Sequence, residues 1–172
     1  MMLRLGLTLG AGALLLGTAQ ADMTTSDGSK IIAKLQDTAG VDHGMAVVKM
    51  RDGIMHITVK ATGLLEGVHG MHIHAIGKCD GANFAGAGGH WNPDMKLHGH
   101  DNPMGAHRGD LPNLVVGADG RGIIKADIPA GSGELIDADG ASLVIHASPD
   151  DYKTDPSGNS GARIACGVFT KA

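Results

Sequence analysis

Aromatic residues are nearly absent from this chain of 172 residues. It contains one Trp, one Tyr and two Phe, so a core must be built mainly from Val, Ile, Leu, Met and Ala. The 28 glycines imply many turns and argue against a helical bundle.

Long apolar runs are equally scarce, and the only candidate lies at the N-terminus. The run from Leu5 to Gly17 follows Arg4 and holds about 13 apolar residues, too few to span a bilayer as a transmembrane anchor. Ala19-Gln20-Ala21 then gives the small-x-small pattern that a signal peptidase cleaves. We therefore predict a cleaved signal peptide over residues 1–21, and a mature protein in the periplasm or outside the cell.

Basic residues are fewer than acidic ones. Fourteen Lys and Arg stand against 18 Asp and Glu, a formal net charge of −4. Loss of residues 1–21 removes Arg4 and no acid, which leaves 13 against 18 and a net charge of −5. An acidic chain without a cluster of Lys and Arg in its sequence is a poor candidate for binding nucleic acid or an anionic membrane.

The chain has only two cysteines, Cys79 and Cys166. An even pair in an exported protein is most simply one disulfide, and two free thiols are the alternative. The loop that this disulfide would close is long, so the chain-entropy model assigns it roughly 4–5 kcal/mol.

The mature chain reads as short strands after a patternless lead at 22–29. No run has sustained helical periodicity, whereas alternating apolar residues flank the turns at Asp52-Gly53 and Asp119-Gly120. The predicted strands cover 31–35, 43–50, 54–60, 70–74, 113–116, 122–128, 142–146 and 163–170. These segments predict an all-β domain.

Two long loops, at 75–112 and 147–162, are rich in Gly, Pro, His and Asp. Structureless loops of this length in a compact domain are usually functional or disordered. Both loops carry the unusual residues of the chain, which favours a functional role.

Histidine is the residue type in excess. Seven of the ten histidines lie between His69 and His107. His72 and His74 are two residues apart in a strand-like stretch, so period-2 alternation places both imidazoles on one face. His90, His98, His107 and Asp110 follow in the first long loop, and His146 ends a later strand.

This donor set suits zinc or copper, because calcium and magnesium prefer shells made only of oxygen. Any one of these histidines alone could be a surface or satisfied core residue. A zinc site needs four ligands, and seven candidates exceed that number, so the pattern indicates two ions.

From about Lys30 to its C-terminus the chain resembles the copper/zinc superoxide dismutase family. The matching segments are His69-Gly-Met-His-Ile-His74, Gly89-His90-Trp-Asn-Pro93, His107-Arg-Gly-Asp-Leu111 and Gly158-Asn-Ser-Gly-Ala-Arg-Ile-Ala-Cys-Gly-Val168. The resemblance implies one domain over 30–172 with an eight-stranded antiparallel Greek-key β-barrel, an immunoglobulin-like sandwich. It also implies an oxidoreductase that converts superoxide and protons to dioxygen and hydrogen peroxide, as an antioxidant defence outside the cytoplasm.

The resemblance assigns one copper and one zinc ion per subunit. The implied copper ligands are His72, His74, His90 and His146. The implied zinc ligands are His90, His98, His107 and Asp110, so that His90 bridges the two ions. Asp150 corresponds to the carboxylate that links a copper ligand to a zinc ligand from behind; a solvated loop acid is the alternative. Arg163 corresponds to the arginine that binds the anion beside copper, and a salt-bridged strand arginine is the alternative. Cys79 and Cys166 correspond to the internal disulfide of the family.

Some features depart from the family pattern or lie outside it. The loop at 147–162 is shorter than in the animal enzymes, so the charges that steer the substrate cannot be carried over, and Lys153 is the one candidate replacement. His43, His56 and His100 match no ligand and are predicted to be surface residues.

The sequence does not distinguish a monomer from a homodimer. Two rival functions are a non-catalytic copper carrier of the same fold and a zinc hydrolase, for which no Glu lies near the histidines.

Overall fold

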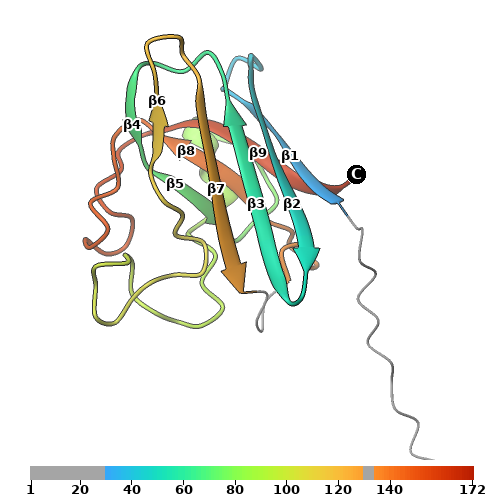
Figure 1. Ribbon diagram of the computed structural model, residues 1–172, viewed down its shortest axis with the longest axis vertical. Coiled ribbons are helices and arrows are strands. Elements are labelled where there is room, and N and C mark those ends of the chain that lie inside the picture. Colours follow the sequence, from blue (N-terminus) through green and yellow to red (C-terminus); the bar gives the residue numbers. More distant parts are fainter. Residues whose placement is uncertain (1–29, 130–133) are drawn as a thin grey trace, which may run out of the picture.

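The computed structural model describes residues 30–129 and 134–172, so the predicted signal peptide and lead lie outside the described residues. These contain nine strands and one short 3-10 helix (Figure 1). In chain order they are β1 (Lys30–Gln36), β2 (Asp42–Arg51), β3 (Ile54–Ala61), β4 (Gly67–His69), β5 (Met71–His74), η1 (Ala82–Ala87), β6 (Leu114–Val116), β7 (Gly122–Pro129), β8 (Ser142–His146) and β9 (Arg163–Lys171). Within the described ranges, a helix long and apolar enough to cross a membrane is not found.

The strands form a curled antiparallel sheet that closes on itself through one chain segment. Seven strands run in the order β5-β8-β9-β1-β2-β3-β7, and β4 pairs with β6 in a second, two-stranded sheet. β6 lies beside β7, and β4 continues into β5 across Gly70 alone. The segment 67–74 therefore joins both edges of the large sheet, as a barrel requires.

Alternation along the strands places the core inside this barrel. In β1, Ile31, Ala33 and Leu35 are buried, and the residues between them face outward. Most of the core is aliphatic, as the scarcity of aromatic residues requires; Val48, Ile57 and their neighbours pack against one another in a single cluster.

The predicted all-β fold is confirmed, with two differences in detail. The eight expected strands become nine because the segment 67–74 pairs first with β6 and then with β8, with Gly70 between the two pairings. Helix η1 was not predicted. Asn83 and Phe84 have left-handed backbone angles inside it, so it has no regular helical periodicity to detect.

The predicted disulfide joins Cys79, in the first long loop, to Cys166 on β9. A small second core of Phe84, Ala87, Val144 and Cys166 packs beside it. The bond and this core together attach the loop to the barrel wall. The two long loops gather on one side of the molecule, beside β5 and β8 (Figure 1).

Candidate metal centre

Four buried imidazole nitrogens of the described residues have no hydrogen-bond partner. They are His72 Nδ1, His74 Nε2, His90 Nε2 and His146 Nε2. One ring atom from each of these histidines lies within 4.8 Å of the others. A buried polar atom without a partner costs free energy, so four converging lone pairs fit a bound cation.

The second nitrogen of each ring is anchored, which orients the first. His72 Nε2 lies 2.8 Å from Asp150 Oδ2, and His74 Nδ1 donates to the carbonyl of Gly88 at 2.9 Å. His146 Nδ1 donates to the carbonyl of Gly161 at 3.2 Å. Anchoring of this kind fixes the ring orientation of metal-binding histidines in general.

A second set of donors surrounds one carboxylate oxygen of Asp110. The Nδ1 atoms of His90, His98 and His107 lie 2.9, 3.1 and 3.2 Å from Asp110 Oδ1. His90 Nδ1 and His107 Nδ1 are 3.3 Å apart. Zinc–nitrogen bonds of about 2.0 Å in a tetrahedron place ligand atoms roughly 3.3 Å apart, so this spacing fits zinc.

His72 also lies within 4.8 Å of members of this second set. Its Nε2 is bound to Asp150, however, and its Nδ1 belongs to the four partnerless nitrogens of the first set. We therefore place His107, rather than His72, around Asp110.

His90 belongs to both sets. Its Nδ1 faces Asp110, and its Nε2 is one of the four partnerless nitrogens. The ring stacks on His72 with centroids 4.0 Å apart. One imidazole can thus present a nitrogen to each of two ions.

Asp150 connects the two sets from behind. Its two oxygens lie 2.8 Å from His72 Nε2 and 3.0 Å from His98 Nε2. Asn113 holds the backbone of Asp150 by two hydrogen bonds, one from its Nδ2 and one to its Oδ1. The amide of Tyr152 also donates to Asp150 Oδ1.

Gly158 lets the second long loop pack tightly on this carboxylate. Its φ of 64° lies in the left-handed region, and a Cβ there would overlap Asp150 Oδ1 and crowd His98 Nε2. Sequence reasoning missed both Asn113 and Gly158, because their roles depend on contacts between separate loops and not on any local motif.

Burial keeps three histidines of the first set neutral. Desolvation lowers the pKa of His72 to about 4, against the opposing effect of Asp150. It lowers the pKa of His74 to about 2 and that of His146 to about 3. A neutral imidazole is the form that binds a metal, so these rings are available at neutral pH.

In the second set, around Asp110, burial lowers the pKa of His107 as in the first set, but His98 shifts in the opposite direction. Burial of His98 would lower its pKa, but hydrogen bonds to Asp110 and Asp150 outweigh it and raise the pKa to about 9. Burial also acts to raise the pKa of both carboxyls, yet their histidine partners hold each pKa well below its usual range. Two buried carboxylates, Asp110 within this set and Asp150 behind it, provide negative charge that a divalent cation would balance.

Arg163, the first residue of β9, stands beside the first set. Its two terminal nitrogens donate to the carbonyls of Phe84 and Gly88 at 2.7 Å each, and Gly88 also anchors His74. The positive charge of Arg163 contributes to the low pKa of His74 and of His146. The guanidinium is thus fixed near the partnerless nitrogens, and only partly buried.

Comparison with known proteins agrees with this geometry. A family model described as copper/zinc superoxide dismutase matches residues 42–169. The chain belongs to the copper/zinc superoxide dismutase family.

The relatives differ in their sequence identity to this chain and in the share of each chain that the match covers. "Superoxide dismutase [Cu-Zn] 2" of Aquifex aeolicus is 40% identical over 169 residues, 92% of this chain and 95% of the relative. "Superoxide dismutase-like protein YojM" of Bacillus subtilis is 47% identical over 122 residues, 67% of this chain but only 62% of its own length. A solved Cu/Zn superoxide dismutase from Brucella abortus superposes with a TM-score of 0.65 at 30% identity, covering 81% of this chain and 98% of that one.

The family implies copper and zinc as the metals, and the two donor sets fit them. The remaining histidines lie outside both sets. His43 and His56 are half-buried and face Asp37 and Asp127, and His100 is exposed, so the predicted surface position fits His100 best.

Two further residues singled out by the sequence lie outside both donor sets. His69 is buried between carbonyls of Leu65 and His146, a structural position beside β8. Lys153 is exposed on the second long loop.

Proposed function

We propose that this protein is a superoxide dismutase that converts superoxide and protons to dioxygen and hydrogen peroxide. The observation that carries the proposal is the convergence of four partnerless imidazole nitrogens next to a second donor set, around Asp110, that shares His90. A fixed, partly exposed arginine beside the four nitrogens supplies the binding charge for a small anion.

Each donor set would hold one ion. Copper would be bound by His72, His74, His90 and His146, and zinc by His90, His98, His107 and Asp110. Copper, when bound, supplies one-electron chemistry, whereas zinc has no redox role.

The side chains of the chain position the substrate and a proton. Arg163 binds the anion through guanidinium N–H groups that its two carbonyl partners leave free. His90 Nε2, the nitrogen on the copper side, can hold a proton and pass it to the bound anion, while Nδ1 stays with the zinc set. Asp150 and the Gly88 carbonyl keep the surrounding rings in position.

We also propose that the protein works outside the cytoplasm, in the periplasm or outside the cell. The Cys79–Cys166 disulfide supports this, because such bonds persist in oxidising compartments. Intact mass measurement of the protein recovered from a periplasmic fraction tests it: a mature chain starting near Asp22 supports export, and a full-length cytoplasmic product contradicts it.

The metal-loaded protein should remove superoxide catalytically in a pulse-radiolysis or cytochrome c assay. Removal of copper alone should abolish the activity, whereas removal of zinc alone should leave a measurable part of it. A copper carrier would bind both metals and show no turnover. A zinc hydrolase would be indifferent to copper. Either result would overturn the proposal.

A further inference from the structure

Outward-facing residues of β1, β2, β3 and β7 form a strongly basic surface on the opposite side of the barrel wall from the core. Strand register arranges these twelve residues in three rows, which we name the lysine face. The rows are Lys30–Lys49–His56–Asp127, Ile32–Val47–Thr58–Lys125 and Lys34–Met45–Lys60–Ile123.

The lysine face concentrates the positive charge of an acidic protein. It holds five of the nine lysines in the chain and only one of the 18 acids, Asp127. Asp127 is engaged by His56 Nδ1 at 2.7 Å. Among the described residues, none of the five lysines forms an ion pair. Their charge is therefore available to a partner.

Stability does not account for this arrangement. Lys30 and Lys49 stand directly opposite each other on neighbouring strands, and like charges in that position are destabilising. Lysines are used to protect exposed sheet edges, but β1, β2 and β3 each have a neighbour on both sides. An ordinary solvated surface mixes charges of both signs, which this face does not.

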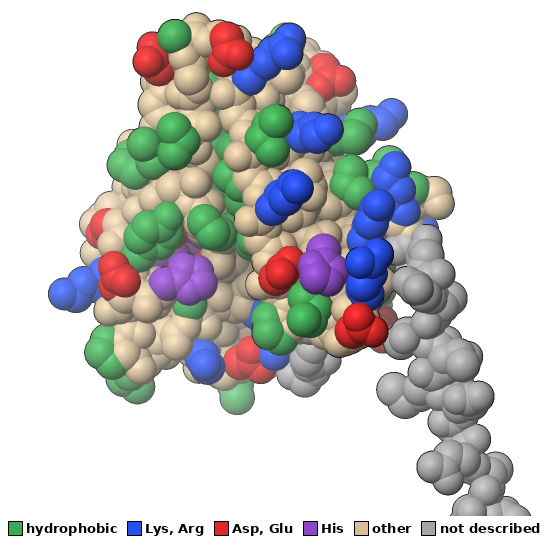
Figure 2. All heavy atoms as spheres, viewed as in Figure 1, with side chains coloured by type: hydrophobic (Ala, Val, Ile, Leu, Met, Phe, Trp, Pro, Cys, Tyr) green, Lys and Arg blue, Asp and Glu red, His purple; other side chains and the backbone are tan. Residues whose placement is uncertain are grey.

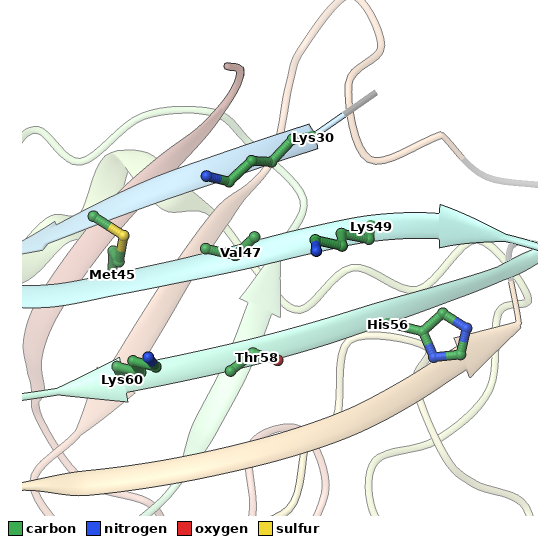
Figure 3. A pocket seen from close by; sticks show the side chains of 7 residues that line it. All are labelled: Lys30, Met45, Val47, Lys49, His56, Thr58 and Lys60. Carbon is green, nitrogen blue, oxygen red and sulfur yellow. The ribbon is translucent and has the colours of Figure 1, made fainter. Parts of the chain in front are cut away.

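The centre of the lysine face is hollowed. Short side chains, Val47 and Thr58, form the floor of a cavity of about 350 Å³, and Lys30, Lys49 and Lys60 rise around it (Figure 3). Figure 2 shows Lys and Arg side chains gathered over this part of the barrel, on the right of the view, with a histidine among them. An anionic group bound in this cavity would have lysine ammonium groups on several sides.

We propose that the lysine face binds a linear polyanion. The lysine side chains would contact the negative groups spaced along the backbone of that polyanion. Rows and strands with ordinary sheet spacings make the face roughly 13 by 14 Å, enough for several charged groups of an extended chain. The twelve positions include no Trp, Tyr, Phe or Leu, the residues that anchor a protein in a membrane interface. Protein interfaces are likewise depleted in lysine and rich in aromatic residues, which leaves the polyanion as the favoured occupant.

Inorganic polyphosphate is a suitable probe, with the full mature protein titrated at low and at physiological salt. We expect binding that weakens steeply as salt increases, because lysine contacts release counterions. The triple variant Lys30→Gln, Lys49→Gln, Lys60→Gln should bind at least about tenfold more weakly. The matched control replaces Lys78, Lys96 and Arg121, three exposed cations elsewhere, by Gln and should stay within about twofold of the native protein.

Three further measurements separate the outcomes. Replacement of the same three lysines by Arg should restore binding, since the charge is kept. If the Gln triple does not fold, Lys49→Gln alone should still weaken binding severalfold. Equal weakening of polyphosphate binding in the two Gln triples would mean that only the net charge of the protein matters. Binding to phosphatidylglycerol vesicles without binding to polyphosphate would indicate that the lysine face binds a membrane surface. Either result overturns the proposal.

Discussion

The imidazole rings in this protein divide their two nitrogens between different tasks. In His72, His74 and His146, one nitrogen is held by a carboxylate or carbonyl and the other has no partner. Because each ring is fixed by groups outside the donor set, the set is arranged before any ion arrives. A preformed site of this kind costs little reorganisation on metal binding.

Replacement of Arg163 by Glu tests the anion site. The variant places a negative charge where superoxide should bind, so we expect the second-order rate constant for superoxide to fall at least about tenfold at low salt. Copper and zinc contents, measured by plasma mass spectrometry, should stay normal. Arg121→Glu makes the same charge change in an exposed turn and should have little effect. Unchanged activity in the Arg163 variant would remove the assigned role.

The buried histidines predict how the metal-free protein responds to pH. His72, His74 and His146 have pKa values of about 4, 2 and 3 in the folded protein, below the ordinary value of 6.5. Their contribution to stability is therefore complete above pH 6.5 and declines as the pH falls, because the unfolded chain then binds more protons. Each such histidine changes the free energy of unfolding by up to about 1.4 kcal/mol per pH unit.

His98 acts in the opposite direction. Its pKa is raised to about 9, so its contribution is complete below pH 6.5 and is lost as the pH rises toward 9. The urea midpoint of metal-free protein should therefore be highest near pH 6.5 and lower at pH 5.5 and at pH 9. A midpoint that does not change over this range would contradict both shifts.

At the scale of elements, one side chain outside the second long loop holds the backbone of Asp150 within it. Asn113, just before β6, makes two hydrogen bonds to the backbone of Asp150, which in turn contacts His72 and His98. We expect Asn113→Ala to weaken zinc binding about 10-fold, the lower end for groups that support ligands. It should also cost about 1–3 kcal/mol of stability, since Asp150 loses two buried partners.

A competition titration with a zinc chelator measures the affinity. Thr154→Ala is the matched control, because its hydroxyl donates only within the same loop, to Asp151, and is exposed. The control should bind zinc like the native protein. Equal losses in both variants would show that the loop as a whole, and not the Asn113 contact, positions Asp150.

Strands were predictable from the sequence because alternation is local, as in β1 and β3. The break between β4 and β5 at Gly70 could not be predicted from the sequence. It depends on the strands with which the two halves of the segment 67–74 pair, β6 and β8. Ligand candidates were visible from spacing and motif, whereas Asn113 contacts a residue 37 positions away. The lysine face was also invisible, because only strand register brings Lys30, Lys49 and Lys60 together.

For the whole molecule, charge is separated by region. The formal net charge is −4, yet five lysines share one face, and Arg163 stands beside the four partnerless nitrogens. Attraction of an anionic substrate must therefore be a local property of the site, because the average field of an acidic protein repels it.

Neutralising the lysine face distinguishes local from long-range steering. The triple variant Lys30→Gln, Lys49→Gln, Lys60→Gln takes the formal net charge from −4 to −7. Lys30 and Lys49 lie at the end of the sheet where β9 reaches Lys171, eight residues from Arg163 or about 26 Å along the strand, whereas the Debye length is about 8 Å at 0.15 M ionic strength. Stopped-flow rates with superoxide should therefore match the native protein at 0.15 M. At 0.01 M, where the Debye length is about 30 Å, the variant should be slower. A clear loss at 0.15 M would mean that the lysine face itself steers superoxide and that Arg163 is not its main attractor.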